Sequence, residues 1–276
     1  MNGPRLSRRT SFGVVVGTYA LAAVAAGLAA HWLDGHHPLT VALAADVVAT
    51  LVVFAASMAV GNASLYDPYW SVAPPVIAVA WVFAADDSGN NTRQALVVAL
   101  IGVWAIRLTG NWAYGWPGLH HEDWRYVRLR ANRGAVPWWL VNLGGIQLVP
   151  TLVVFLGMLP VWAAVTGDRG LGWLDAVAAL VTGGAIALEA TADAQMHRFR
   201  ADPDNRGRVN KVGLWGRFSH PNYLGEIGFW WGLWLFALAA DPSWWWTVIG
   251  PLAMVALFAR ISIPMMNQRL RERSQV

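Results

Sequence analysis

Polar residues gather at the start of the tryptophan-rich apolar stretch RFSHPNYLGEIGFWWGLWLF, residues 217–236. Pro221 fits the first turn of a helix and disfavours a helical conformation at the preceding residue. We therefore predict a helix that begins at Pro221 and is capped by Ser219 or His220. Together with Arg217, the free N–H groups and the positive dipole end of that helix would form a site for a phosphate or pyrophosphate.

One face of this predicted helix carries polar groups into the apolar segment. Asn222, Glu226 and Trp230 follow one another at intervals of four, so they line the same face. A carboxylate about one turn inside a membrane helix is too costly to expose to lipid. We therefore expect Glu226 to face a polar pocket, with a buried ion pair to an arginine such as Arg107 as the structural alternative.

A series of acidic and basic residues precedes this stretch in EATADAQMHRFR. Glu189, Asp193, His197 and Arg200 follow at intervals of four, four and three, which places them on one helical face. Ordinary pairs that hold a helix end would explain the series. Acids at membrane depth instead favour the wall of a cavity, and Arg200 would then join Arg217 as a ligand of a phosphate.

Two earlier stretches also carry candidate residues. Asp67, in NASLYDPYW, lies at or inside the start of an apolar segment. There it either caps the next helix through an Asx-Pro turn or faces a polar cavity. In VWAIRLTGN, the residues Trp104, Arg107 and Asn111 share one helical face, and Arg107 either extends to the membrane surface or joins the polar interior.

The stretch HHEDWRY, residues 120–126, places two histidines and two acids in one short loop. Their spacing matches no zinc motif, so we expect an ion-paired loop wall and no metal. The chain contains no cysteine, which excludes disulfides and cysteine-based zinc or haem sites.

The composition is that of a membrane protein. Of the 276 residues, 56% are hydrophobic and 13% are charged, whereas soluble domains have about 25% charged residues. Many of the 18 tryptophans lie near the ends of apolar segments, where indole rings prefer the membrane interface. We predict an all-α transmembrane bundle of about eight spans, forming one domain over residues 1–276, with a cofactor pocket open to the cytoplasm.

Eight apolar segments can be distinguished, and most are long enough to cross a hydrocarbon core of about 30 Å. The third begins with Asp67 and prolines, which indicates a broken or re-entrant segment. The first follows a basic start, but no cleavage site follows it, so we interpret it as a helix and not as a signal peptide. The segments are residues 12–33, 40–60, 66–84, 94–112, 138–165, 171–195, 222–240 and 244–262.

The basic residues predict the orientation. With eight spans and a cytoplasmic N-terminus, 18 of the 20 Lys and Arg residues lie on the cytoplasmic side, and only Arg93 and Arg169 lie outside. We therefore expect both termini in the cytoplasm. The pI of about 9.8 then reflects topology and contact with anionic lipid headgroups, not binding of nucleic acid.

The stretch GLWGRFSHPNYLGEIGFWWG, residues 213–232, resembles the C-terminal signature of the steroid 5-alpha-reductase-like membrane proteins, above all bacterial members of unassigned function. The stretches LYDPYWS, VWAIRLTGN, EDWRY and ADAQMHRFR resemble other blocks of that family, in the same order. A looser His-Pro-Asn-Tyr block also occurs in membrane methyltransferases.

This resemblance implies a helical bundle in the bacterial inner membrane, with NADPH entering from the cytoplasm and a lipophilic substrate from the bilayer. By position, Asp67 could replace a catalytic glutamate of the relatives, and Trp104 aligns with a catalytic tyrosine. An indole cannot donate a phenolic proton, which argues against a steroid substrate. The resemblance places five residues on the cofactor wall, Asp193, Arg200, Asn222, Tyr223 and Glu226, and the residue pattern adds Arg107, Arg217 and His220.

The leading hypothesis is an NADPH-dependent reductase of a carbon–carbon double bond, in which Asp67, Trp104 and Glu226 carry the chemistry. An acid near a substrate carbonyl would stabilise and protonate the developing enolate. Two alternatives stay open: an S-adenosylmethionine-dependent membrane methyltransferase, and a non-catalytic protein that binds or transports lipid. The catalytic core would cover about residues 62–264, with the first one or two helices peripheral to it.

Overall fold

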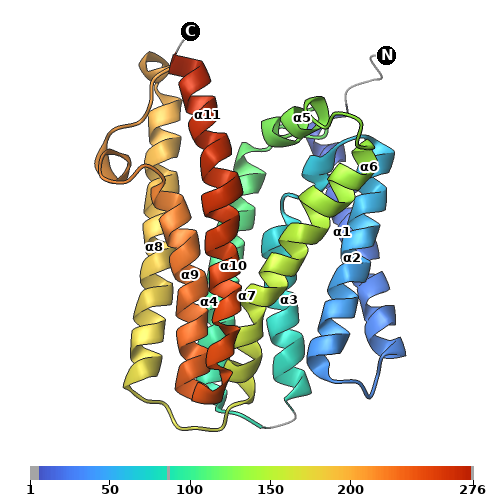
Figure 1. Ribbon diagram of the computed structural model, residues 1–276, viewed down its shortest axis with the longest axis vertical. Coiled ribbons are helices and arrows are strands. Elements are labelled where there is room, and N and C mark those ends of the chain that lie inside the picture. Colours follow the sequence, from blue (N-terminus) through green and yellow to red (C-terminus); the bar gives the residue numbers. More distant parts are fainter. Residues whose placement is uncertain (1–5, 86–87, 275–276) are drawn as a thin grey trace. The chain divides into compact units, whose positions relative to one another are not determined.

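The computed structural model describes residues 6–85 and 88–274, and every regular element in that part is helical (Figure 1). Arg5, one of the basic residues used for the orientation, lies outside the described residues. The longer helices are α1 (Arg8–Trp32), α2 (Pro38–Val60), α3 (Tyr69–Ala84), α4 (Asn91–Gly115), α7 (Val149–Thr166), α8 (Trp173–Ala201), α9 (Pro221–Ala240), α10 (Ile249–Leu257) and α11 (Ile263–Ser274).

Short helical elements connect or extend them. They are η1 (Ala63–Tyr66), α5 (Trp124–Ala131), α6 (Trp138–Leu140), η2 (Val141–Leu148), η3 (Pro203–Asn205), η4 (Gly213–Gly216), η5 (Pro242–Val248) and η6 (Phe258–Ser262). Both π-helical elements, η2 and η6, end two residues before a proline, Pro150 and Pro264. A proline has no N–H to donate to the preceding turn, which accounts for the local change in helical hydrogen bonding.

Seven segments are long and apolar enough to cross a membrane, which confirms the predicted helical membrane protein. Helix α3 is not among them, because its 16 residues span only about 24 Å at a rise of about 1.5 Å per residue. The third predicted segment is therefore shorter than a typical span. Its first residues form η1 and a turn, in agreement with the expected break. The seven segments are Arg8–Trp32, Pro38–Val60, Asn91–Gly115, Trp138–Thr166, Trp173–Ala201, Pro221–Ala240 and Pro242–Glu272.

The described chain divides into two compact units. The first comprises the described part of Met1–Ile77 together with Leu108–Phe155. The second comprises the described part of Ala78–Arg107 and Leu156–Val276.

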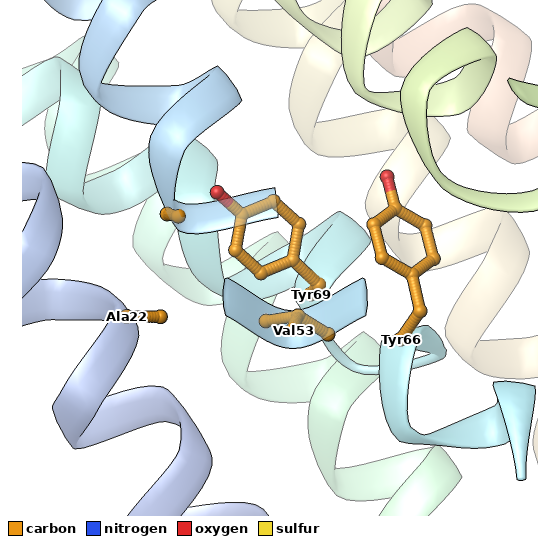
Figure 2. Packing of buried hydrophobic residues seen from close by; sticks show 5 residues of the cluster. Ala22, Val53, Tyr66 and Tyr69 are labelled. Atoms are coloured by element: carbon orange, nitrogen blue, oxygen red, sulfur yellow. The ribbon is translucent and has the colours of Figure 1, made fainter. Parts of the chain in front are cut away.

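The interior of the first unit combines aliphatic and phenolic side chains. Ala22 of α1 and Val53 of α2 pack in one buried cluster with Tyr66 of η1 and Tyr69 of α3 (Figure 2). The two tyrosine rings lie 5.3 Å apart between centroids. The segment after α2 therefore turns back into the unit and places two phenols in its interior. Gly61, with a φ of 69°, ends α2 and permits this reversal.

In the second unit, helices α8 and α9 pack closely because glycines of α9 face α8. A Cβ atom added at Gly225 would lie 2.7 Å from the Cβ of Glu189, and one added at Gly228 would lie 3.1 Å from the Cβ of Ala185. Gly232 faces Thr182 in the same way. Small residues let membrane helices approach at backbone distance, and this approach fixes the position of Glu226 beside α8.

Candidate functional site

The second unit holds Glu226 in a buried cage of aromatic side chains. The carboxylate accepts a hydrogen bond from the Trp104 indole at 3.0 Å and one from the Trp230 indole at 2.9 Å. The bond to Trp230 joins residues four apart on α9, as the predicted helical face requires. Two of the three predicted catalytic residues, Trp104 and Glu226, are therefore in direct contact.

Trp104 is fixed by more than this hydrogen bond. Its ring stacks on Phe229 with centroids 4.5 Å apart and planes 9° apart, and it meets Trp230 edge to face. All three aromatic side chains are fully buried. A carboxylate offers about four acceptor positions, so Glu226 can hold both indoles at once.

Arg107 joins the two acids of the sixth predicted segment. Its guanidinium lies 2.8 Å from Oε1 of Glu189 and 2.7 Å from Oδ2 of Asp193. The Arg107 and Glu189 side chains are 13% and 6% exposed, so the pair is shielded from solvent. The structure thus brings together two residues predicted for the cofactor wall. The alternative to a polar pocket for Glu226 was an ion pair with an arginine such as Arg107. In the structure, the acidic partners of Arg107 are Glu189 and Asp193.

The predicted start of α9 is confirmed at Pro221, with His220 at the N-cap position. His220 is thus one of the two predicted cap residues, but its side chain makes no capping hydrogen bond. Instead, Nε2 of His220 lies 3.0 Å from Oδ1 of Asn267 in α11. The His220 ring also stacks on Tyr223, which contacts Phe258. Pro221 has no N–H, and the N–H groups of Tyr223 and Leu224 donate to the carbonyl oxygen of His220, so in the first turn of α9 the N–H of Asn222 is the backbone donor left for a ligand.

The surroundings of this helix start are polar. Arg200 and Arg217 are exposed, and Asn222 is half-buried. A pocket of 540 Å³ lies along α11, lined by Pro264, Asn267, Gln268 and Arg271. Asn267 belongs to this pocket and also contacts His220, so the pocket adjoins the residue that precedes α9.

The third predicted catalytic residue, Asp67, belongs to the first unit. Its Oδ1 accepts a hydrogen bond of 2.6 Å from the phenol of Tyr126 in α5. Burial raises the pKa of Asp67 to about 7, although the nearby Arg125 acts in the opposite direction. Burial, and then the charge of Asp67, also raise the pKa of Tyr126. A carboxyl group with a pKa near neutrality suits proton transfer.

The HHEDWRY loop is docked on the segment that contains Asp67. Asn62 donates to the carbonyl oxygens of Leu119 and His121, and Glu122 accepts the N–H of Ala63. Glu122 of the loop pairs with Arg130 of α5, and Asp123 pairs with Arg125. The predicted ion-paired loop is confirmed, and the described residues contain no group of three metal-ligating side chains.

Sequence reasoning missed one partner and one buried acid. The partner is Tyr126, which donates a hydrogen bond to Asp67. The acid is Asp46, which lies within α2, is 5% exposed and accepts a 2.6 Å hydrogen bond from Tyr69. A single acid in the run VALAADVVATLVV is a signal that could have identified it, because ionisable residues inside membrane helices are rare and commonly functional.

Comparisons with known proteins match most of the chain. A family model described as "Protein of unknown function (DUF1295)" matches residues 53–276. An uncharacterized protein of Schizosaccharomyces pombe is 26% identical over 249 residues, which are 80% of this chain and 71% of the yeast protein. No solved structure matches the chain.

Proposed function

The chain belongs to the DUF1295 family, and we propose that it is a membrane-embedded reductase related to the steroid 5-alpha-reductase-like proteins. In this proposal NADPH supplies a hydride for a carbon–carbon double bond in a lipophilic substrate that enters from the bilayer. The substrate belongs to the steroid-like, isoprenoid or lipid classes, and the missing phenol at Trp104 argues against a steroid.

The start of α9 is the observation that carries this proposal. This helix of 20 residues has no capping hydrogen bond from the His220 side chain, and the N–H of Asn222 is left in its first turn after Tyr223 and Leu224 donate to the carbonyl oxygen of His220. Arg217 precedes the helix by four positions. A backbone donor, the helix dipole and an exposed guanidinium together support a site for a phosphate. The arginines favour a dinucleotide over S-adenosylmethionine, which carries no phosphate.

The other residues have separate tasks in this proposal. Asn222, Tyr223 and the Arg107–Asp193 pair form the wall that holds and orients the dinucleotide. Glu226 fixes Trp104 through the hydrogen bond to its indole. Asp67, with its pKa of about 7, is the candidate proton donor for the substrate.

The first test of the proposal is the binding of NADPH to Arg200→Ala and Arg217→Ala. Loss of a charged hydrogen bond costs about 1.5–3 kcal/mol, so each variant should bind NADPH about ten- to a hundredfold more weakly in a fluorescence titration. Arg169→Ala is the matched control, because Arg169 is an exposed arginine just before the opposite end of α8. Equal affinity in all three variants would contradict the proposed phosphate site. A larger loss for NADPH than for NADH would assign the residue to the 2′-phosphate.

The proposed location is the cytoplasmic membrane of a bacterium, with both termini inside. The distribution of the basic residues supports it, and an even number of crossings requires the short helix α3 to cross. A cysteine at Ser7 that reacts with an impermeant thiol reagent outside intact cells would contradict this orientation.

A further inference from the structure

A polar pocket lies in the second unit at the end of α9, far from the proposed phosphate site at its start. Helix α9 has 20 residues, so its two ends are about 30 Å apart at a rise of about 1.5 Å per residue. The pocket has a volume of 390 Å³, which falls in the range of about 300–1,000 Å³ that is typical of small-molecule sites. Its wall includes Gly167, Asp168, Arg169, Ala240, Asp241 and Trp244.

The loop after α7 forms one side of this pocket and is held in place. A Cβ atom added at Gly167 would lie 2.8 Å from the Cβ of Ala240, so this loop touches the end of α9. Arg93, whose side chain is fully buried, donates to the carbonyl oxygen of Gly167 at 3.2 Å and to that of Gly170 at 3.4 Å. The backbone is therefore anchored on both sides of the two charged residues between these glycines.

The charges around the pocket suit a ligand that carries both signs. Helices α7 and α9 both end at the pocket, at Thr166 and Ala240, and the C-terminal end of a helix carries a partial negative charge. The carboxylates of Asp168 and Asp241 add to it, and Arg169 is the basic residue of the wall. Within the described part of the chain, the side chains of Asp168 and Arg169 have no hydrogen-bond or ion-pair partner. Their charges are therefore available to a ligand.

The tryptophans of η5 indicate that the pocket lies at the membrane surface. Trp244 is half-buried in the pocket wall, whereas the next two residues, Trp245 and Trp246, are 64% and 40% exposed. Exposed indole rings prefer the membrane interface, so the pocket lies at the level of the lipid headgroups. The face of an indole ring also attracts an ammonium group, which gives the half-buried Trp244 a role beside the two carboxylates.

We propose that this pocket binds a phosphoethanolamine group. The ammonium donates to Asp168 and Asp241 beside the Trp244 ring, and the phosphate pairs with Arg169. A choline group has no N–H to donate and a glycerol headgroup has no positive charge, so neither matches the two carboxylates. The group is found in the headgroup of phosphatidylethanolamine and in soluble phosphate esters, and the exposed tryptophans favour the lipid. This site does not depend on the proposed reductase reaction.

Native mass spectrometry of the full chain in mild detergent tests the site. Dihexanoyl-phosphatidylethanolamine should bind about tenfold more tightly than the phosphatidylcholine and phosphatidylglycerol of the same chain length, because it alone offers a charged N–H donor. Asp168→Asn should weaken its binding about threefold, the effect of losing one exposed ion pair. The double variant with Asp241→Asn should weaken it about tenfold. The asparagine at position 241 keeps an oxygen for the N–H of Ser243, so the start of η5 is preserved.

The matched control is Asp204→Asn, because Asp204 is an exposed aspartate of η3, which follows the far end of α8. This variant should bind the lipid like wild type. Since Asp168 has no partner in the described chain, Asp168→Asn tests the site even if the double variant does not fold. Equal affinities for the three lipids would overturn the proposal, as would wild-type binding of phosphatidylethanolamine by Asp168→Asn.

The source of the group is tested by adding phosphoethanolamine without acyl chains to the lipid-bound protein. We expect no displacement of phosphatidylethanolamine at concentrations at which the short-chain lipid itself saturates the site. This result would support a lipid site. Displacement at equal concentrations would support the same chemistry but assign the pocket to a soluble ligand, and it would overturn the lipid as the source.

Discussion

Glu226→Gln is expected to bind the phosphate end of NADPH like wild type but to oxidise NADPH about a hundredfold more slowly in a single turnover, the size of effect that follows loss of a preorganised polar group. The carboxylate holds two indole N–H groups at 2.9 and 3.0 Å. A glutamine has one acceptor oxygen and one NH₂ group, so one of the two indoles must lose its acceptor. Trp104 would then no longer be held firmly on Phe229.

Trp230→Phe is the matched control for this prediction. It removes one donor of the same cage and keeps the charge of Glu226. An unsatisfied buried group costs about 1–3 kcal/mol, so both variants should melt at lower temperature than wild type. Only Glu226→Gln should lose turnover if Glu226 positions the reacting groups. A folded Glu226→Gln protein with the turnover of wild type would remove Glu226 from the site.

Arg107→Met is expected to cause the largest loss of stability. The substitution keeps an apolar stem but leaves Glu189 and Asp193 as adjacent buried carboxylates without their cation. Breaking a buried ion pair by removing one partner costs about 3–5 kcal/mol. The side chains of Arg107, Glu189 and Asp193 are 13%, 6% and 17% exposed, so solvent screening weakens the effect little.

The control for Arg107 is a more exposed ion pair of the same kind. Arg130 pairs with Glu122 at 3.0 Å but is 39% exposed, and such pairs are worth about 1 kcal/mol or less. Melting temperatures in one detergent should therefore fall much more for Arg107→Met than for Arg130→Met. Adding Glu189→Gln and Asp193→Asn to Arg107→Met should recover most of the loss. Equal losses in the two single variants would show that the Arg107 cluster contributes little.

The helices were predictable because their signal is local. Runs of apolar residues and the proline at position 221 define most segments and the start of α9. Helix α3 is the instructive case, because the polar stretch between Asn62 and Pro68 shortens it. That stretch does not simply interrupt a span, since it also carries Tyr66 into the interior of the first unit.

The contacts of the site were less predictable because they join distant positions. Glu226 and Trp104 are 122 residues apart, and Asp67 and Tyr126 are 59 apart. Helical spacing shows that Asn222, Glu226 and Trp230 share a face, but it cannot show which segment faces them. In the structure, the close approach of α8 and α9 at Gly225 places Glu189 of α8 against α9. This approach results from tertiary packing, which the spacing of residues within one helix does not reveal.

Identification of the small molecule that copurifies with the protein tests the central claim most directly. The protein would be purified in mild detergent and denatured, and the released compounds identified by mass spectrometry. The proposed function predicts NADPH or NADP⁺ in wild type and much less of either in Arg217→Ala. S-adenosylmethionine in its place, or no nucleotide even after incubation with NADPH, would contradict the reductase and favour a methyltransferase or a lipid-binding protein.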